Sequence, residues 1–536
     1  MDQKAVRRLV DRGVAEGRSL VAVRRAGMLG GASPRDLARM LTALQRNGPI
    51  SAGATIAALK HGPRTALVDD LGTLTFAEMD ARATRLAAVL RDRGICDGAT
   101  LGVLCRNHRY ALEAIFAGAR AGARVVFLNT SFAAPQVRDV AAREGLRLLI
   151  VDEDLLGLTA EVDAPKVLAW GEGPHERVED LVARSSATSV PAPAKRGGIV
   201  LLTSGTTGTP KGAQRAEPRG LLVPGMLLDR IPLRSEQTAL MCAPLFHATG
   251  FAMTILLIGL GTTVVLHRRF DPEETLEDLE RHRAEAVVLV PVMLQRLLAV
   301  GADAVRAKDT SALRVVFCAG SQLPGELSDR AMDLLGDVVY NLYGSTEVSV
   351  ATIATPQDLR EAPGCTGRPV LGTTVRLLDD AGREVPAGQT GRIFVGGFTS
   401  FDGYTGGGGK EVVGGLMSTG DVGHFDAQGR LFIDGRDDEM IVSGGENVFP
   451  REVEELLVHH EAIADAAAIG VPDEDFGQRL RAFVVLEPGA EMTEDDVRDY
   501  VKENLARFKV PRDVVFVDEL PRNPSGKILK KELAER

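Results

Sequence analysis

The chain has 536 residues, of which 45% are hydrophobic and 25% charged, and its formal net charge is −10 at pH 7. This length exceeds one ordinary hydrophobic core, so we expect two or more domains. The negative charge argues against a nucleic-acid-binding protein, and any anionic ligand must be held by a local site.

The cysteines and the apolar segments bear on the cellular compartment. The cysteines are odd in number, scattered and without metal-ligand spacing: Cys96, Cys105, Cys242, Cys318 and Cys365. This argues against a disulfide framework and fits a reducing cytosol. The best candidate for a membrane span, residues 251–266, is broken by Gly259 and Gly261, so no spanning helix is predicted. We therefore expect a cytoplasmic protein.

Residues 1–50 are predicted to form a helical leader. Val6, Leu9, Val10 and Val14 recur at helical spacing, with basic residues between them. The segment is Arg-rich and lacks the continuous apolar core of a secretory signal. We expect a helix that caps the main domain. The alternative is a helix on the inner face of the membrane, because basic amphipathic helices can lie on anionic lipid.

From residue 51 onward, short apolar runs alternate with longer amphipathic segments. Residues 100–105, 124–129 and 147–152 are typical of buried strands, and residues 110–122 are typical of a helix. The same rhythm returns between residues 286 and 344. Such alternation predicts an α/β architecture with largely parallel sheets. After residue 370, strand-like runs are separated by Gly and Pro turns, which indicates an antiparallel β region.

The stretch TSGTTGTPKG, residues 203–212, follows a predicted strand at residues 199–202. Glycines let the backbone curl so that successive N–H groups face inward and bind an anion. Hydroxyl groups add donors and Lys211 adds a positive charge, which suits a polyphosphate. The stretch is not the ordinary P-loop, because Gly205 is followed five residues later by Pro210. The candidate phosphate-binding residues are Thr203, Ser204, Gly205, Thr206, Thr207, Gly208, Thr209 and Lys211. A flexible surface turn is the alternative.

This stretch resembles the phosphate-binding signature of the adenylate-forming superfamily, which includes acyl-CoA synthetases, luciferases and the adenylation domains of peptide synthetases. The resemblance extends over about residues 50–536. It implies a large N-terminal domain of stacked α/β sheets plus a β region (residues 51–437) and a small mobile α+β C-terminal domain (residues 438–536). It also implies the substrates ATP and CoA, with Mg²⁺. The Ala/Arg-rich composition and the leader most resemble an actinobacterial fatty-acid–CoA ligase.

Three further segments of the large domain carry the resemblance. In YGSTE, it implies that Tyr343 and Gly344 line the nucleotide site, that Thr346 contacts phosphate and that Glu347 binds Mg²⁺. A hard cation takes oxygen ligands and bridges phosphates; a helix N-cap is the alternative for this motif. The segment CAGSQLP, residues 318–324, is expected to lie beside adenine through Gly320 and Ser321. The segment PLFHATG, residues 244–250, is expected to gate the acyl and thiol tunnels through His247. A packed loop histidine is the alternative for His247.

The segment after residue 417 supplies the remaining positions. The resemblance implies that Asp421 binds both ribose hydroxyls, that Arg436 contacts the ribose and that Asp438 is the hinge between the domains. A carboxylate can accept two hydrogen bonds from such a diol. Gly444 and Gly445 would line the thiol tunnel, and glycine permits the close backbone approach that a slim thiol arm needs. Luciferases carry a second catalytic lysine at the position of Gly444, so a light-producing reaction is disfavoured.

Near the end of the chain, Lys527 in NPSGKILKKEL matches the lysine that catalyses adenylation in this superfamily. A lone lysine is otherwise expected to be solvated. The predicted reaction converts a carboxylate and ATP to acyl-AMP and pyrophosphate, and then transfers the acyl group to the thiol of CoA.

Aromatic residues make up 4% of the chain, which does not favour an aromatic acid, so a medium- to long-chain fatty acid is expected. The alternatives are a fatty acyl-AMP ligase that loads a carrier protein and a non-catalytic nucleotide- or acyl-binding protein.

Overall fold

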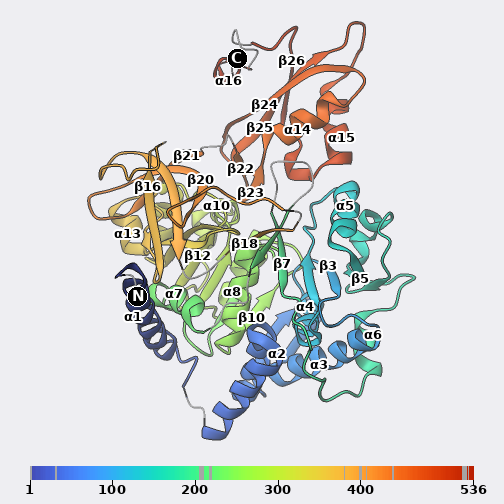
Figure 1. The fold of residues 1–536 in the computed structure, drawn as a ribbon, viewed down its shortest axis with the longest axis vertical. Helices are drawn as coiled ribbons and strands as arrows, with labels where there is room; N and C mark the ends of the chain where they lie inside the picture. Colours follow the sequence, from blue (N-terminus) through green and yellow to red (C-terminus); the bar gives the residue numbers. More distant parts are fainter. Residues whose placement is uncertain are drawn as a thin grey trace.

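The protein is described from a computed structural model, which covers all residues except 1–2, 31–32, 204–210, 216–219, 380, 398–400, 406, 437–439, 522–527, 529 and 536. A large N-terminal domain occupies the lower part of Figure 1 and a small C-terminal domain lies above it. Among the described residues, the strands form three sheets in the large domain and one in the small domain. The predicted fold class is confirmed.

The largest sheet is mostly parallel and has the order β15-β14-β13-β12-β11-β9-β10-β1-β2 in the described part of the chain. Its strands are β1 (Thr65–Asp69), β2 (Gly72–Thr75), β9 (Thr238–Met241), β10 (Thr263–Leu266), β11 (Ala286–Leu289), β12 (Val315–Ala319), β13 (Val339–Ser345), β14 (Ser349–Ala354) and β15 (Arg368–Pro369). The strands from β13 to β1 pair in parallel, and the edges are antiparallel. Parallel strands are covered on both faces, which explains continuous apolar runs such as VVFCA in β12.

The second sheet has the order β18-β8-β7-β4-β3-β5-β6 in the described residues. Its strands are β3 (Thr100–Leu104), β4 (Arg124–Phe127), β5 (Leu146–Val151), β6 (Lys166–Leu168), β7 (Ile199–Thr203), β8 (Lys211–Arg215) and β18 (Phe401–Tyr404). The strands from β7 to β6 are parallel. Three strands predicted from the sequence, at residues 100–105, 124–129 and 147–152, are confirmed here.

Helices pack between and around these sheets. They are α3 (Phe76–Asp92), α4 (Arg109–Ala121), α5 (Ala134–Glu144), η1 (Glu153–Thr159), α6 (Val178–Arg184), α7 (Leu222–Arg230), α8 (Ala248–Gly259), α9 (Pro272–Arg281), α10 (Pro291–Ala299), α11 (Ala302–Arg306), α12 (Gly325–Leu335) and α13 (Pro356–Glu361). The main core joins the two sheets, because Phe116 of α4, Val125 of β4 and Val264 of β10 share one buried cluster. Burial of such side chains is the dominant favourable term in folding.

The predicted antiparallel β region forms the third sheet. Its strands are β16 (Thr373–Leu378), β17 (Gly391–Gly397), β19 (Val412–Val413), β20 (Leu416–Phe425) and β21 (Leu431–Arg436). All of their pairings are antiparallel in the described residues. The pairing of β20 with β21 sets Asp421 opposite Arg436.

The small domain is a sheet with helices on it. Its elements are β22 (Ile441–Ser443), β23 (Glu446–Val448), α14 (Pro450–Val458), β24 (Ile463–Asp473), β25 (Gly477–Leu486), α15 (Glu494–Asn504), η2 (Arg507–Lys509), β26 (Asp513–Phe516) and α16 (Lys530–Ala534). The buried ammonium of Lys509 contacts both carboxylate oxygens of Glu452 at 2.7 and 2.6 Å. This pair fixes η2 to α14, and a buried charge that loses its partner is strongly destabilising.

Contacts of η2 and of the turn between β24 and β25 join the small domain to the large domain. The backbone N–H of Arg507 donates to the carbonyl of Ser131 at 3.2 Å, and Phe508 packs on an apolar cluster of the large domain. The amide of Gln295 donates to the carbonyl of Glu474 at 2.6 Å. In Figure 1, β23 lies where the domains meet, whereas α16 lies at the other end of the small domain.

Within residues 1–50, the predicted leader, the structure has helix α1 (Gln3–Arg25) and the start of α2 (Pro34–His61), which continues past residue 50. Gly48 (φ 73°, ψ 168°) and Pro49 interrupt α2, because proline removes a helical hydrogen bond and its ring restricts the preceding residue. Helix α1 packs on α7, and α2 contacts α8. None of the described helices is long and apolar enough to cross a membrane. The five cysteines are all free.

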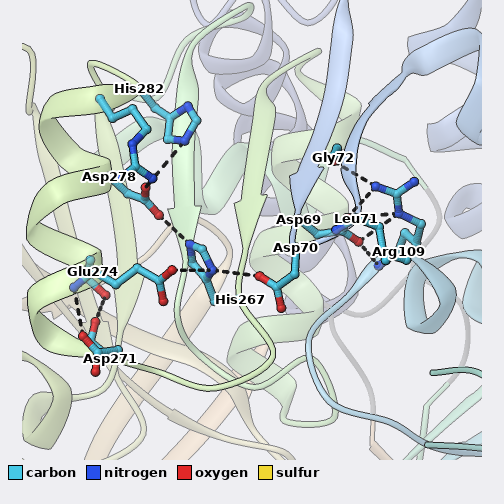
Figure 2. A network of polar contacts seen from close by, with 12 residues as sticks. Asp69, Asp70, Leu71, Gly72, Arg109, His267, Asp271, Glu274, Asp278 and His282 are labelled. Atoms are coloured by element: carbon cyan, nitrogen blue, oxygen red, sulfur yellow. Dashed lines mark hydrogen bonds and ion pairs between the residues drawn. The ribbon is translucent and has the colours of Figure 1, made fainter. Parts of the chain in front are cut away.

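His267, just after β10, forms a charged network that ties β10 to α9 (Figure 2). Its Nε2 lies 2.5 Å from Oδ2 of Asp278, and its Nδ1 lies 3.1 Å from Oδ1 of Asp70 and 3.5 Å from Glu274. The hydrogen bond to Asp278 outweighs partial burial, and the nearby carboxylates add to it, so the pKa of His267 rises to about 9.

This network predicts a pH-dependent stability. The folded-state pKa of His267 is above the ordinary 6.5. The contribution of its protonated ring to the free energy of unfolding is therefore complete below pH 6.5 and is lost as the pH rises through about 9. His267→Gln should therefore lower the Tm below pH 6.5, and its difference from wild type should vanish above pH 9. Scanning calorimetry at both pH values checks this, with His175→Gln as the control. An unchanged Tm difference across the range would contradict it.

Candidate active site

One large cavity, of about 2890 Å³, lies at the domain junction and extends into the large domain. The predicted site residues that line it come from both domains: Lys211, His247, Gly320, Ser321, Tyr343, Gly344, Thr346, Glu347, Asp421, Gly444 and Gly445. Several of them follow the carboxyl ends of parallel strands, which is where ligands bind in open α/β sheets.

The first motif spans the connection from β7 to β8. Thr203 ends β7 and pairs with Lys211, the first residue of β8. The ammonium of Lys211 lies 5.6 Å from the ring centroid of Tyr404 on β18, within the range of a cation–π contact. The intervening predicted residues, Ser204, Gly205, Thr206, Thr207, Gly208 and Thr209, lie outside the described residues.

Glu347 is buried and has two hydroxyl partners. The hydroxyl of Tyr404 donates to Oε1 at 2.6 Å, and the hydroxyl of Ser345 donates to Oε2 at 2.9 Å. Burial and the charge of Glu347 raise the pKa of Tyr404, so its phenol remains a donor. Tyr404 therefore links Glu347 to Lys211. This link could not be predicted from the sequence, because residue 404 belongs to none of the motifs.

The YGSTE segment ends β13 and turns into β14. A Cβ atom on Gly344 would lie 1.9 Å from the carbonyl oxygen of Ser349, so only glycine fits there. Thr346 and Glu347 occupy the turn and face the cavity. The alternative interpretation as a helix N-cap is wrong, because residues 346–348 form a turn between two strands.

Asp421, on β20, lies beside this motif. The hydroxyl of Tyr343 donates to Oδ2 of Asp421 at 2.5 Å. Asp421 also pairs with Arg436 in the β20–β21 register; the side chain of Arg436 lies outside the described part. Tyr343 of YGSTE and Asp421 of the segment after residue 417 are therefore in contact, although 78 positions separate them.

Gly445, in the hairpin turn of the small domain, lies against the large domain. Gly444 (φ +59°) and Gly445 (φ +89°) form the turn between β22 and β23. A Cβ atom on Gly445 would lie 3.8 Å from the side chain of Val290 and 4.0 Å from the carbonyl oxygen of Gly320. The backbone of the hairpin therefore approaches the predicted adenine segment, Gly320 and Ser321, closely.

A charged contact joins the two domains beside this hairpin. Nε2 of His247, at the start of α8, lies 3.0 Å from Oε1 of Glu446 on β23, which also accepts from the amide of Asn129 at 3.2 Å. Burial lowers the pKa of His247, but the charge and hydrogen bond of Glu446 outweigh it, so the pKa is raised. His247 correspondingly lowers the pKa of Glu446 against the opposing effect of burial. From the sequence, Glu446 is expected only as part of the segment 443–448 along the thiol tunnel, and neither this contact nor Asn129 is predicted.

Glu446→Gln should reverse the pKa shift of His247. The neutral amide removes the attraction for the imidazolium, burial then dominates, and the pKa of His247 should fall below its ordinary value. An NMR titration of isotopically labelled histidine, with the resonance assigned through His247→Gln, measures this. Glu491→Gln, an exposed change in the same domain, is the control. An unaltered His247 titration in Glu446→Gln would contradict the contact.

The predicted catalytic Lys527 and hinge Asp438 lie outside the described residues. The elements next to them are defined. Strand β21 ends at Arg436 and β22 begins at Ile441, on either side of the predicted hinge. After Lys527, α16 packs Leu533 into the small-domain core, and Lys530 lies 2.9 Å from Glu454.

The residues around Glu347 suit Mg²⁺. The carboxylate of Glu347 and the hydroxyls of Ser345, Thr346 and Tyr404 present oxygen atoms, which are the ligands that this cation prefers. Mg²⁺ is usually bound through one or two carboxylates plus substrate phosphates, so the single buried carboxylate of Glu347 is compatible with such a site.

Two protein-family models match the chain. The AMP-binding enzyme model matches residues 55–405, and the AMP-binding enzyme C-terminal domain matches residues 452–527. A feruloyl-CoA synthase from Amycolatopsis sp is 34% identical over 483 residues, which covers 89% of this chain and 97% of the relative. A fatty acid–[acyl-carrier-protein] ligase, ScoC from Streptomyces coeruleorubidus, is 30% identical, and the match covers 89% of this chain and 94% of the relative. The relatives are therefore not specifically fatty-acid–CoA ligases.

Solved structures of similar enzymes cover nearly the whole chain. Amide bond synthetase McbA from Marinactinospora thermotolerans is 28% identical with a TM-score of 0.81, covering 90% of this chain and 99% of that one. A double mutant of o-succinylbenzoate CoA synthetase (MenE) from Bacillus subtilis, bound with the product analogue OSB-NCoA, is 27% identical with a TM-score of 0.78, covering 90% and 98%. MenE with the acyl-adenylate OSB-AMP is 28% identical with a TM-score of 0.65, and the match covers 90% of this chain and 97% of that one. The chain belongs to the AMP-binding enzyme family and is an AMP-forming acid–thiol ligase.

Proposed function

We propose that the protein activates a medium- to long-chain fatty acid as its acyl-AMP and transfers the acyl group to CoA. One observation carries the proposal. Glu347, the hydrogen-bonded pair Tyr343–Asp421 and the Gly444–Gly445 hairpin line a single cavity. These residues therefore support a nucleotide site and, in the same cavity, a glycine turn that a slim thiol arm could approach closely.

In the first half-reaction, a carboxylate must approach the α-phosphate of ATP, and both are anions. Catalysis is therefore mostly positioning and charge neutralisation. Asp421 would hold the ribose, Arg436 would assist it, and Lys211 with the preceding loop would bind the β- and γ-phosphates. Mg²⁺ at Glu347 would neutralise phosphate oxygens. Lys527 would bridge the acyl carboxylate and the α-phosphate.

In the second half-reaction, the thiol must reach the acyl carbonyl. The domain arrangement supports this state: Gly445 approaches Gly320, and Glu446 contacts His247 across the junction. The same relative, MenE, fits this chain better with its CoA product analogue (0.78) than with its acyl-adenylate (0.65). We infer that the small domain rotates about Asp438 between the steps, a hinge motion of the usual kind. Gly444 and Gly445 would line the thiol tunnel, and His247 would gate it.

Transfer to an acyl carrier protein is the second candidate. It is favoured by the relative ScoC, a fatty acid–[acyl-carrier-protein] ligase that matches 89% of this chain. The identity of the acid is open to a second class as well, since feruloyl-CoA synthase and indoleacetate–CoA ligase are relatives at 34% and 32% identity.

Product analysis with ATP and Mg²⁺ tests the proposal. Saturated fatty acids from short to long chain, ferulate and indoleacetate are each supplied with CoA or with a holo acyl carrier protein. We expect acyl-CoA with an optimum among the fatty acids. Thioester formation with the acyl carrier protein alone would contradict transfer to CoA and favour the second candidate. Thioester formation from the aromatic acids alone would overturn the fatty-acid assignment.

A further inference from the structure

The leader forms part of the cavity that contains the active site. We propose that α2 is the far wall of the acyl-binding pocket and that a long alkyl chain of the substrate lies between α2 and α8. This inference rests on the proposed function and makes the leader a determinant of chain length. The AMP-binding enzyme model begins only at residue 55, so most of this wall lies outside the matched region.

The leader is firmly attached to the large domain. A Cβ atom on Gly225 of α7 would lie 2.3 Å from Oγ of Ser19, so α1 and α7 are in direct backbone contact. The backbone N–H of Ser235 donates to the carbonyl of Ala26 at 2.7 Å. The ammonium of Lys60 donates to the carbonyl of Met28 at 2.7 Å, and the guanidinium of Arg196 donates to that of Gln45 at 2.5 Å. These contacts fix α2 in one position.

The first half of α2 has an apolar face that the described residues leave partly exposed. Leu37, Leu41 and Leu44 follow the i, i+4, i+7 spacing of one helix face, and they are 46%, 60% and 39% exposed. Met40, on the adjoining part of the same face, is buried. All four line the cavity. Contiguous exposed apolar side chains of this kind mark a ligand groove or an interaction site.

The cavity connects this face to the catalytic residues. Its lining runs along α8 from His247 and Ala248, beside the active site, to Gly259 at the end of the helix. Twelve helical residues correspond to a path of about 17 Å at 1.5 Å per residue. Every residue of α2 that lines the cavity is apolar. The lining and the length of this path suit a flexible alkyl chain, which has no polar groups to satisfy, better than a single aromatic ring.

Two substitutions test the wall in opposite ways. Gly53 of α2 lines the cavity, and a Cβ atom there would meet no atom within 4 Å, so Gly53→Leu should fill the path without a clash. We expect its chain-length optimum to shift to shorter acids. Leu41→Glu places a charge on the exposed face and should raise the KM for dodecanoate by about tenfold, the effect of losing burial of about two methylene groups. The KM for butyrate should be unchanged.

The controls are Gly17→Leu and Val21→Glu, matched changes at exposed positions of α1 that do not line the cavity. Calorimetric titration with dodecanoate in the absence of ATP measures binding without turnover. Weaker dodecanoate binding to Leu41→Glu, in a protein that makes no acyl-CoA, would support the wall and contradict the proposed function. Normal thioester formation with equal KM values in all variants would overturn the wall and leave the function intact. Loss of anionic-vesicle binding in Leu41→Glu with an unchanged chain-length profile would also overturn the wall, in favour of a membrane helix.

Discussion

Lys527→Ala is expected to abolish acyl-AMP formation and largely to spare thioester formation from supplied acyl-AMP. The lysine would neutralise charge only where the carboxylate meets the α-phosphate, and removal of one such preorganised donor costs about 10²–10³-fold in rate. In the proposed thioester-forming arrangement, Gly445 of the β22–β23 hairpin faces Gly320 of the large domain instead. Acid-dependent AMP release and thioester formation from synthetic acyl-AMP measure the two half-reactions separately.

The control for this variant is Lys502→Ala, which removes a half-exposed lysine of α15 whose ammonium lies 3.7 Å from the carboxylate of Asp499. It should leave both half-reactions unchanged. Equal losses in both half-reactions of Lys527→Ala would contradict the assigned role, since a lysine that acts in adenylation alone has no place in the second step.

Gly445→Leu is expected to act on the opposite half-reaction. A side chain at this position points toward Val290 and Gly320, where its Cβ alone would already make van der Waals contact at 3.8 to 4.0 Å. The larger side chain should displace the hairpin or fill the thiol path, and a displacement of 1 Å at a reacting centre costs about 10²-fold. CoA-dependent thioester formation should fall by this factor, while acyl-AMP formation changes little.

The positive φ of Gly445 complicates this variant, because any side chain is strained there. Gly489→Leu is the matched control: its φ is +86° and a Cβ atom would meet nothing within 4 Å. It carries the same backbone strain away from the junction and should retain both half-reactions. A CoA-dependent rate in Gly445→Leu equal to that of the control would contradict the tunnel.

The sequence could predict the α/β fold because its strands are continuous apolar runs separated by amphipathic helices. The resemblance to adenylate-forming enzymes, carried by short motifs, also predicted residues that share one site. Lys211, Glu347 and Asp421 illustrate this, because the structure places all three around one cavity.

The contacts between motifs could not be predicted in this way. The hydrogen bond from Tyr404 to Glu347 joins residues 57 positions apart, and the His247–Glu446 contact joins residues 199 positions apart. Both depend on how separate sheets and domains are packed, which periodicity does not encode. The leader shows the same limit. Its helical spacing was evident, but the pattern alone could not show that Leu41 faces the cavity.

Exchange of labelled pyrophosphate into ATP, in the absence of CoA, tests the central claim most directly. An enzyme that forms acyl-AMP reversibly must catalyse this exchange only when its acid is present. We predict fatty-acid-dependent exchange that requires Mg²⁺, with thioester and AMP appearing once CoA is added. Release of ADP and phosphate instead, or the absence of exchange with every carboxylic acid, would contradict the account.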